Sequence, residues 1–253
     1  MRKRIFIVAM ATAMLLSLGA ISSMADGSAE NGKIIHGGTE NFDSIESNKE
    51  YGAVAEPIAN SSDDGTDKDA TLNVNSGVKV EPPAGSTVGT EGIKADAQDE
   101  EKAEVNVGKG GSGDVTVTDN NENSPSTTGV SVHASAKTNN SSASASVNGD
   151  VNVTRKSSND GLATGIEVHS HENDPKGNAT TSVDVTGSVN VTGAKTAIGI
   201  KVDDSGFSNT NGDNTVKVGK DLTVKAGEGA TATGIDFLPP EMLPILKLAT
   251  ISL

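Results

Sequence analysis

The chain of 253 residues contains no cysteine and no tryptophan, and it has only one tyrosine and four phenylalanines. Without cysteine it has no disulfide bond, no thiol nucleophile and no cysteine-ligated zinc site. Its 20 lysines and arginines stand against 34 aspartates and glutamates, which gives a formal net charge of −14 at pH 7. Because binding to nucleic acid requires cationic side chains that neutralise phosphates, this acidic charge argues against nucleic acid as a partner.

The first 25 residues have the layout of a secretory signal peptide. Residues 2–4 are all basic, and residues 5–21 are apolar or small except for two hydroxyl residues. Ser23-Met24-Ala25 then supplies the small-x-small pattern of a cleavage site, before the polar chain that starts at Asp26. An uncleaved membrane anchor is the alternative, although the stretch is near the lower length limit for a span. No second apolar run of that length follows, so we predict an exported protein whose mature chain contains no transmembrane segment.

The middle of the chain is built from a repeat of about 35 residues. A motif of glycine, Ile or Val, a polar residue and an apolar residue begins at Gly92, Gly129, Gly165, Gly199 and Gly234, with spacings of 37, 36, 34 and 35 residues. Two further motifs precede each glycine motif, as Val183-Asp184-Val185 and Val189-Asn190-Val191 do before Gly199. Internal repeats of this period indicate a solenoid, a propeller or an array.

Each of the five units therefore contains three short strands with one apolar face. In all fifteen triplets the middle residue is polar and its two neighbours are apolar, which is the pattern of a half-buried strand. A single unit cannot bury its apolar face, whereas stacked units can, with each strand pairing with its equivalents above and below. We therefore predict an all-β fold, a parallel β-helix or similar β-solenoid of about five three-strand coils over residues 70–237. The predicted inner residues include Val151, Val153, Ile166, Val168, Val189, Val191, Ile200 and Val202.

An antiparallel β-sandwich is the alternative fold, since residues 183–191 could form a hairpin that turns at Thr186-Gly187-Ser188. The constant order of the three motifs in all five units favours stacking, because stacking explains that order without further assumptions.

The two flanks of the repeat have different compositions. Residues 26–69 are rich in Gly, Asn, Ser, Asp and Glu without sustained periodicity, so we predict a disordered N-terminal linker or a loose cap. Residues 238–253 form an atypical apolar tail with three prolines and no Gly, Asn or Asp. This tail is either a cap over the open end of the last coil or the out-of-frame end of a disrupted repeat.

Few side chains suggest chemistry. His169 and His171 lie on the same side of an extended segment beside Glu172, a spacing that metal sites use, and His133 occupies the same repeat position as His169. Acidic and amide residues at 110–114, 203–204 and 211–214 could offer oxygen ligands to calcium. The simpler interpretation is that all of these are exposed turn and post-strand residues. We therefore predict no catalytic, cofactor-binding or metal-binding residue and no cofactor.

An enzymatic function must be weighed because many β-helix proteins are polysaccharide lyases or hydrolases. After the signal peptide the chain has a single arginine, Arg155, and no tryptophan on which a sugar could stack. It also has no nucleophile-elbow, zinc-protease or P-loop motif. We therefore expect that the protein is not an enzyme.

The signal peptide, the low aromatic content, the lack of cysteine and repeats such as 149–154 (GDVNVT) and 163–168 (ATGIEV) resemble bacterial surface proteins of the β-strand-repeat class. This class includes the passenger regions of autotransporters and filamentous adhesins, and the resemblance covers about residues 70–237. It implies a secreted or surface-exposed structural or adhesive protein, which presents variable loops to an unknown surface or host ligand, protein or glycan. The family's translocator barrel has no counterpart in this sequence.

Two other functions stay open at this point. One is a polysaccharide-binding or polysaccharide-degrading β-helix protein, and the other is a truncated remnant of a larger autotransporter adhesin.

Overall fold

The computed structural model describes residues 28–29, 31–57, 69–137, 139–156, 161–172, 177–204 and 213–238. The predicted signal peptide and the apolar tail after Leu238 lie outside these residues.

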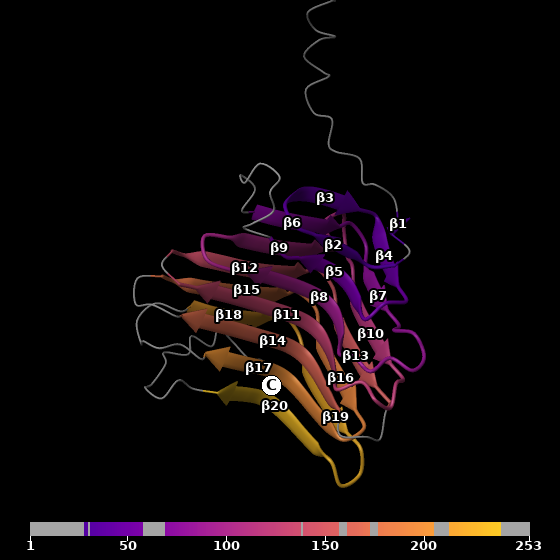
Figure 1. Ribbon diagram of the computed structural model, residues 1–253. Coiled ribbons are helices and arrows are strands. Elements are labelled where there is room, and N and C mark those ends of the chain that lie inside the picture. Colours follow the sequence, from indigo (N-terminus) through magenta and orange to yellow (C-terminus); the bar gives the residue numbers. More distant parts are fainter. Residues whose placement is uncertain are drawn as a thin grey trace, which may run out of the picture.

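The chain winds through three parallel β-sheets, and each coil contributes one strand to each sheet (Figure 1). Every strand pairing in the described part of the chain is parallel. The predicted β-solenoid is therefore confirmed, and the antiparallel sandwich is wrong. None of the described residues forms a helix that is long and apolar enough to cross a membrane.

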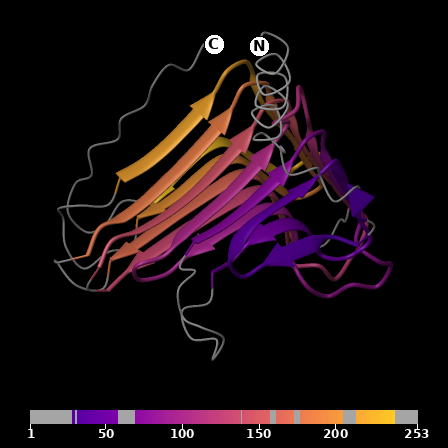
Figure 2. The ribbon, with the colours of Figure 1, turned by 90° about the horizontal axis from the view of Figure 1, so that it is seen from above.

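Sheet A consists of β1 (Ser28–Ala29), β4 (Ser44–Ser47), β7 (Val78–Val80), β10 (Val115–Asp119), β13 (Val151–Arg155), β16 (Val189–Gly193) and β19 (Leu222–Ala226). Sheet B consists of β2 (Lys33–Ile35), β5 (Tyr51–Ala55), β8 (Thr90–Ala97), β11 (Ser126–Ala136), β14 (Leu162–Glu172), β17 (Thr196–Asp204) and β20 (Thr231–Leu238). Sheet C consists of β3 (Gly38–Phe42), β6 (Asp69–Val74), β9 (Lys102–Val107), β12 (Ser141–Val147), β15 (Ala179–Val185) and β18 (Asp213–Val218). Figure 2 shows the stack from above, with the strands of each sheet following one another in chain order.

A continuous apolar core runs along the inside of the coils. In β13, Val151 and Val153 are buried, while Asn152 between them is half-buried on the outer face. Val153 lies in register with valines of the coils on both sides, and complete burial of such a side chain stabilises a fold by about 1.5–3 kcal/mol. The predicted inner residues all belong to this core, namely Val151, Val153, Ile166, Val168, Val189, Val191, Ile200 and Val202.

A column of glycines in sheet B explains the most regular part of the repeat. A Cβ atom added to Gly92, Gly129, Gly165 or Gly199 would lie 2.4–2.7 Å from the carbonyl oxygen of the glycine in the next coil. The same atom would lie 2.6–2.8 Å from valine or leucine methyl groups of sheet A. Glycine is therefore required by close approach of the backbone and core side chains at this point. Gly234, in the last described coil, has no atom within 4 Å of such a Cβ.

The solenoid begins earlier than the sequence pattern predicts. Strands β1 to β5 occupy much of the predicted linker and pair in parallel with the coils that follow. Phe42 lies in register with Val74, and Ile45 with Val78, and both residues are buried. Of the two predicted alternatives, a disordered linker or a loose cap, the first does not describe residues 31–55, which form the first coils of the core. Residues 58–68 lie outside the described part of the chain.

An ion pair is buried where sheet A turns toward sheet B. Arg155 and Asp119 end two adjacent strands in register, with 3.3 Å between Nη1 and Oδ2, and neither side chain is exposed. Oδ2 of Asp119 also accepts hydrogen bonds from the hydroxyl groups of Thr90 at 3.3 Å and Thr127 at 3.0 Å. Because a buried charge is tolerated only when it is paired and hydrogen-bonded, these four residues form one structural unit that joins three coils.

Candidate functional site

Two columns of polar side chains follow the outer face of sheet B across β8, β11, β14 and β17. The first, hereafter the histidine column, consists of Asp96, His133, His169 and Asp203 in register. The second, hereafter the lysine column, consists of Lys94, Ser131, Glu167 and Lys201 in register. Both columns alternate with buried Ile, Val and Ala, so the pleat of the sheet places them outside the core.

The histidine column is a set of direct contacts. Nδ1 of His133 lies 3.1 Å from Oδ1 of Asp96, and the rings of His133 and His169 stack with centroids 4.8 Å apart and planes tilted by 40°. The ring of His171 meets that of His169 edge-on at 6.1 Å. The sequence led us to expect exposed post-strand histidines. Instead β11 and β14 continue through these positions as far as Ala136 and Glu172, and the side chain of His133 is only 31% exposed.

These contacts shift two pKa values in the histidine column. Burial, together with the neighbouring His133, lowers the pKa of His169, and the opposing charge of Asp203 only partly offsets this. Burial alone would raise the pKa of Asp96, but its hydrogen bond with His133 and its ion pair with Lys94 outweigh burial and lower it. At neutral pH the column therefore combines an ionised Asp96 with an uncharged His169.

The lysine column is neutralised by ion pairs. Nζ of Lys94 lies 3.0 Å from Oδ2 of Asp96, and Nζ of Lys201 lies 2.6 Å from Oε1 of Glu167. The hydrogen bond to Glu167 raises the pKa of Lys201. Burial raises the pKa of Glu91, which precedes the glycine of the same strand as Lys94. This face therefore offers many hydrogen-bonding groups but no strong field of one sign.

The predicted metal candidates do not converge on one point. His169 and His171 alternate outward along β14, whereas Glu172 alternates inward and is only 4% exposed. Within the described ranges, no three His, Asp or Glu side chains are placed to hold a metal ion. The spacing of the two histidines therefore does not build a three-ligand site together with Glu172.

Two of the calcium candidates, Asp114 and Asn214, are engaged in hydrogen bonds between coils. Oδ1 of Asp114 accepts a hydrogen bond from the backbone N–H of Asp150 at 2.8 Å, and Oδ1 of Asp150 accepts one from the N–H of Ser188 at 2.7 Å. Nδ2 of Asn214 donates to Oγ of Ser170 at 2.8 Å. The side chain of Asp204 and residues 211–212 lie outside the described residues. The acids of successive turns thus join one coil to the next.

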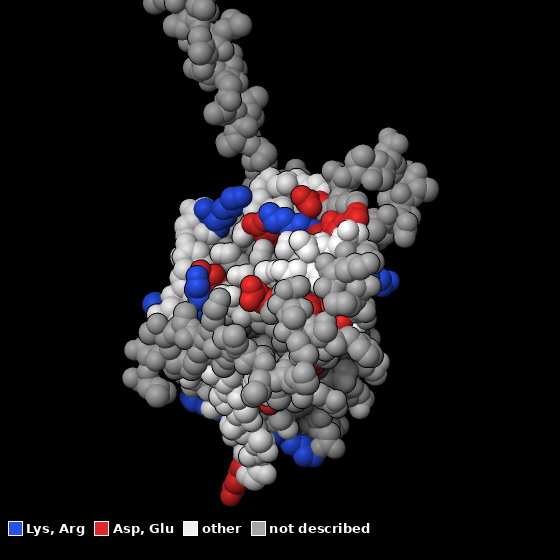
Figure 3. All heavy atoms as spheres, turned by 90° about the vertical axis from the view of Figure 1, so that its left-hand side faces the viewer, with Lys and Arg blue, Asp and Glu red and all other residues white. Residues whose placement is uncertain are grey.

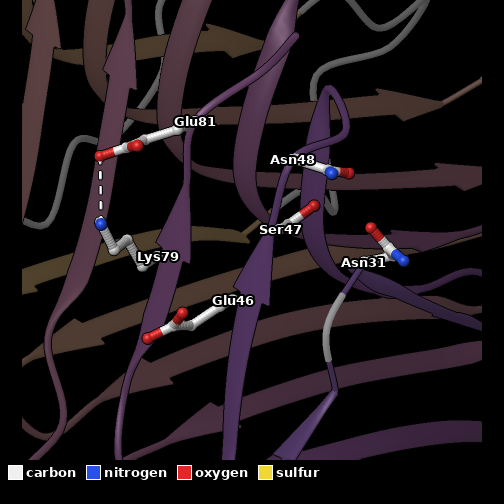
Figure 4. A pocket seen from close by; sticks show the side chains of 6 residues that line it. All are labelled: Asn31, Glu46, Ser47, Asn48, Lys79 and Glu81. Carbon is white, nitrogen blue, oxygen red and sulfur yellow. Dashed lines mark ion pairs between the residues drawn. The ribbon is translucent and has the colours of Figure 1, made fainter.

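A shallow hollow of about 440 Å³ lies over the first coils of sheet A (Figure 4). Its lining is entirely polar and consists of Asn31, Glu46, Ser47, Asn48, Lys79 and Glu81. The ion pair between Lys79 and Glu81, 3.1 Å long, is more than half exposed. The hydroxyl group of Ser47 donates to the carbonyl oxygen of Tyr51 at 2.5 Å. The hollow therefore contains no activated nucleophile and no apolar anchor for a ligand.

The sequence revealed only half of the histidine column. The equivalence of His133 and His169 is visible in the repeat. The sequence analysis does not predict that Asp96 and Asp203 lie next to these histidines. All four residues stand four positions after the repeat glycine, so comparison of that single position in every unit would have found the column.

Comparison with known proteins adds no assignment, because no protein family, no curated protein and no solved structure matches the chain. The functional proposals therefore rest on the sequence, the fold and the surface alone.

Proposed function

We propose that the chain is an exported, non-enzymatic repeat protein with a structural or adhesive role. The observation that carries the proposal is the variable length of the connections around a regular scaffold. Connections from sheet B to sheet C, at the B-to-C corner, range from two residues at 36–37 to eight at 205–212 and thirteen at 56–68, and those from sheet A to sheet B range from two at 194–195 to nine at 81–89. Connections from sheet C to sheet A are mostly three residues long, as at 148–150 and 186–188. Loops that vary in length on a regular scaffold are typical of a binding surface.

The charges on the described part of the B-to-C corner favour a ligand that is not strongly charged. Figure 3 faces the B-to-C corner. Basic and acidic residues are both scattered over its coloured part. The net charge of −14 keeps such a body soluble and makes a polyanionic ligand unfavourable. A protein surface or a neutral glycan is therefore the partner that we propose.

Two further observations support a role without catalysis. Arg155 is the only arginine after the leader, and its side chain lies in the core beside Asp119 with no exposed surface. The lysines on the outer face of sheet B, Lys94 and Lys201, are held in ion pairs with carboxylates. A polysaccharide-degrading site would need a free basic group beside its acids, so this alternative has less support.

The leader and the repeat composition support export and a relationship to the passenger regions of autotransporters and adhesins. A truncated remnant of such an adhesin remains the alternative.

Replacement of the corner loops tests the proposal. Residues 173–178 and 205–212 would each be replaced by Gln-Asp-Glu-Glu, the connection that the chain itself uses at 98–101. In the matched control, residues 120–125 on the A-to-B side would be changed to the sequence of residues 156–161, the equivalent connection of the next coil.

Binding would be measured on a glycan array and on immobilised cell-surface proteins, with circular dichroism as a check of the fold. We expect the corner variant to lose binding that the control keeps. Polysaccharide cleavage, or binding that survives loss of both loops, would contradict the proposal.

A further inference from the structure

The last described coil is half covered. Strands β18, β19 and β20 stand at the ends of their sheets and have a paired neighbour on one side only, within the described residues. Their inner side chains are only partly buried, namely Val216, Val218, Leu222, Val224, Ala226, Ile235 and Phe237. The equivalent residues one coil earlier, Val183, Val185, Val189 and Val191, are 0–1% exposed. The end surface therefore combines open strand edges with an apolar centre, and it is complementary to one more coil of the same kind.

The sequence after β20 repeats the pattern of such a coil. Leu246-Lys247-Leu248 and Ile251-Ser252-Leu253 are both apolar, polar, apolar, like the triplets of sheets C and A. Leu246 follows the repeat glycine Gly234 by 12 residues, and the equivalent residue Val105 follows Gly92 by 13. The second triplet begins 5 residues after the first, against 6 from Val183 to Val189.

The prolines of this segment fall where a ladder hydrogen bond is not required. Pro239, Pro240 and Pro244 precede the first triplet, in the part of the chain that corresponds to the B-to-C connection. Proline cannot donate to a strand ladder, but it is well tolerated in a loop. The segment is thus compatible with a turn followed by two short strands.

We propose that residues 245–253 cover the open end of the solenoid as a further partial coil. Leu246-Lys247-Leu248 pairs with Val216-Lys217-Val218 of β18, and Ile251-Ser252-Leu253 pairs with Leu222-Thr223-Val224 of β19. The leucines and the isoleucine then bury the apolar centre, and the backbone satisfies the strand edges, which otherwise invite association with other chains. This assignment favours a cap over an out-of-frame end for the tail, and it is independent of the proposed ligand.

The tether favours this segment over a second copy of the chain. Leu246 lies eight residues after Leu238, the last residue of β20. A short linker of this kind provides an effective concentration in the millimolar range, about a hundredfold or more above a micromolar protein solution.

Paired cysteines test the register directly, because the chain has none of its own. Lys217→Cys with Lys247→Cys, in the full chain, would place two thiols on adjacent parallel strands about 4.8 Å apart, within reach of a disulfide. The matched control is Asp184→Cys with Lys247→Cys. Asp184 is the neighbour of Lys217 in the preceding coil, so its distance from position 247 would be about twice as long and beyond that reach.

At micromolar protein and under mild oxidation, we expect the first pair to form an intramolecular disulfide about a hundredfold faster than disulfide-linked dimers form. The control pair should not close.

A second measurement does not depend on disulfide geometry. The double variant Leu246→Asp and Leu248→Asp should raise the fluorescence of a hydrophobic dye several-fold and speed cleavage within residues 213–238, while the earlier coils stay protease-resistant. Disulfide-linked dimers in place of the intramolecular bond would assign the end to a second copy and overturn the proposal. Equal closure of the test and control pairs, or an unchanged dye signal, would overturn it as well.

Discussion

Interior coils and the last described coil share one sequence pattern but differ in burial. In the interior, Val147, Val151 and Ile166 are not exposed at all, whereas Val218, Leu222 and Ile235 of the last coil are only partly buried. The register is the same and all of these residues are aliphatic, so burial results from having a neighbouring coil on both sides. In a solenoid, stability is approximately a sum of terms for each coil and for each interface between coils. The same substitution should therefore cost much more in the interior than at the end.

The largest difference is expected for a charge placed in the core. Ile166→Asp would bury an unpaired carboxylate and should destabilise the fold by about 4 kcal/mol or more. Ile200→Asp, one coil further on, should likewise unfold its neighbours, whereas Ile235→Asp in the same column lies in the last described strand of sheet B and should leave the earlier coils folded. Urea unfolding followed by circular dichroism, together with limited proteolysis, measures the difference. Equal loss in Ile166→Asp and Ile235→Asp would contradict the dependence on neighbouring coils.

The next effect is expected at the buried ion pair. Arg155→Ala leaves the charge of Asp119 without its partner in the core, which should cost about 3–5 kcal/mol of unfolding free energy. The double variant Asp119→Leu with Arg155→Met removes both charges and should recover most of that loss. The same urea titration compares the two variants with the parent. If the double variant is no more stable than Arg155→Ala, the loss comes from packing and not from the unpaired charge.

A smaller contrast is expected in the glycine column. Gly165→Ala would force a methyl group against the backbone of Gly199 and two core valines, and overpacking of this kind costs about 1–3 kcal/mol. Gly234→Ala meets no described residue within 4 Å and should therefore cost less than Gly165→Ala. Unfolding midpoints of the two variants provide the test. A loss at Gly234 as large as that at Gly165 would show that backbone conformation, not close approach, selects glycine.

The smallest effect is expected from protonation of His169, a residue that only interior coils surround. Its pKa is lowered in the folded protein, mainly by burial, so the unfolded chain binds the proton more tightly. An uncharged His169 therefore makes its full contribution to the free energy of unfolding above the ordinary histidine pKa of 6.5. That contribution is lost as the pH falls from this value through the lower pKa of His169 in the folded protein. The lowered pKa of Asp96 acts only at more acidic pH, below its ordinary value of 3.8.

Urea midpoints between about pH 7.5 and pH 5.5 should show this dependence. His169→Gln should flatten the profile, whereas His36→Gln, a change at an exposed histidine outside the column, should not. A profile that is unchanged in His169→Gln would place the pH dependence elsewhere.

The sequence was sufficient for the architecture wherever its alternation was strict. It failed over residues 31–55 because the first coils satisfy the same geometry with other residues. Val54 stands in register with Lys94 at an outer position, and Glu40 stands in register with the inner residue Leu72. The pairing of Arg155 with Asp119 could not be predicted either, because a charge at a strand end has the same appearance in a sequence whether it is buried or solvated. Contacts between coils, such as the ion pair of Lys201 and Glu167, require the register as well as the repeat.

Register has a mechanical consequence as well. A chain pulled from its two ends would load the ladder between neighbouring coils, because each coil is joined to the next in all three sheets. Coils would then detach one at a time, and each would release about one repeat, such as the 36 residues from Gly129 to Gly165. At about 3.5 Å per extended residue, each event would lengthen the tether by roughly 120 Å. A solenoid of this kind would dissipate force in nearly equal steps while its remaining coils stayed folded.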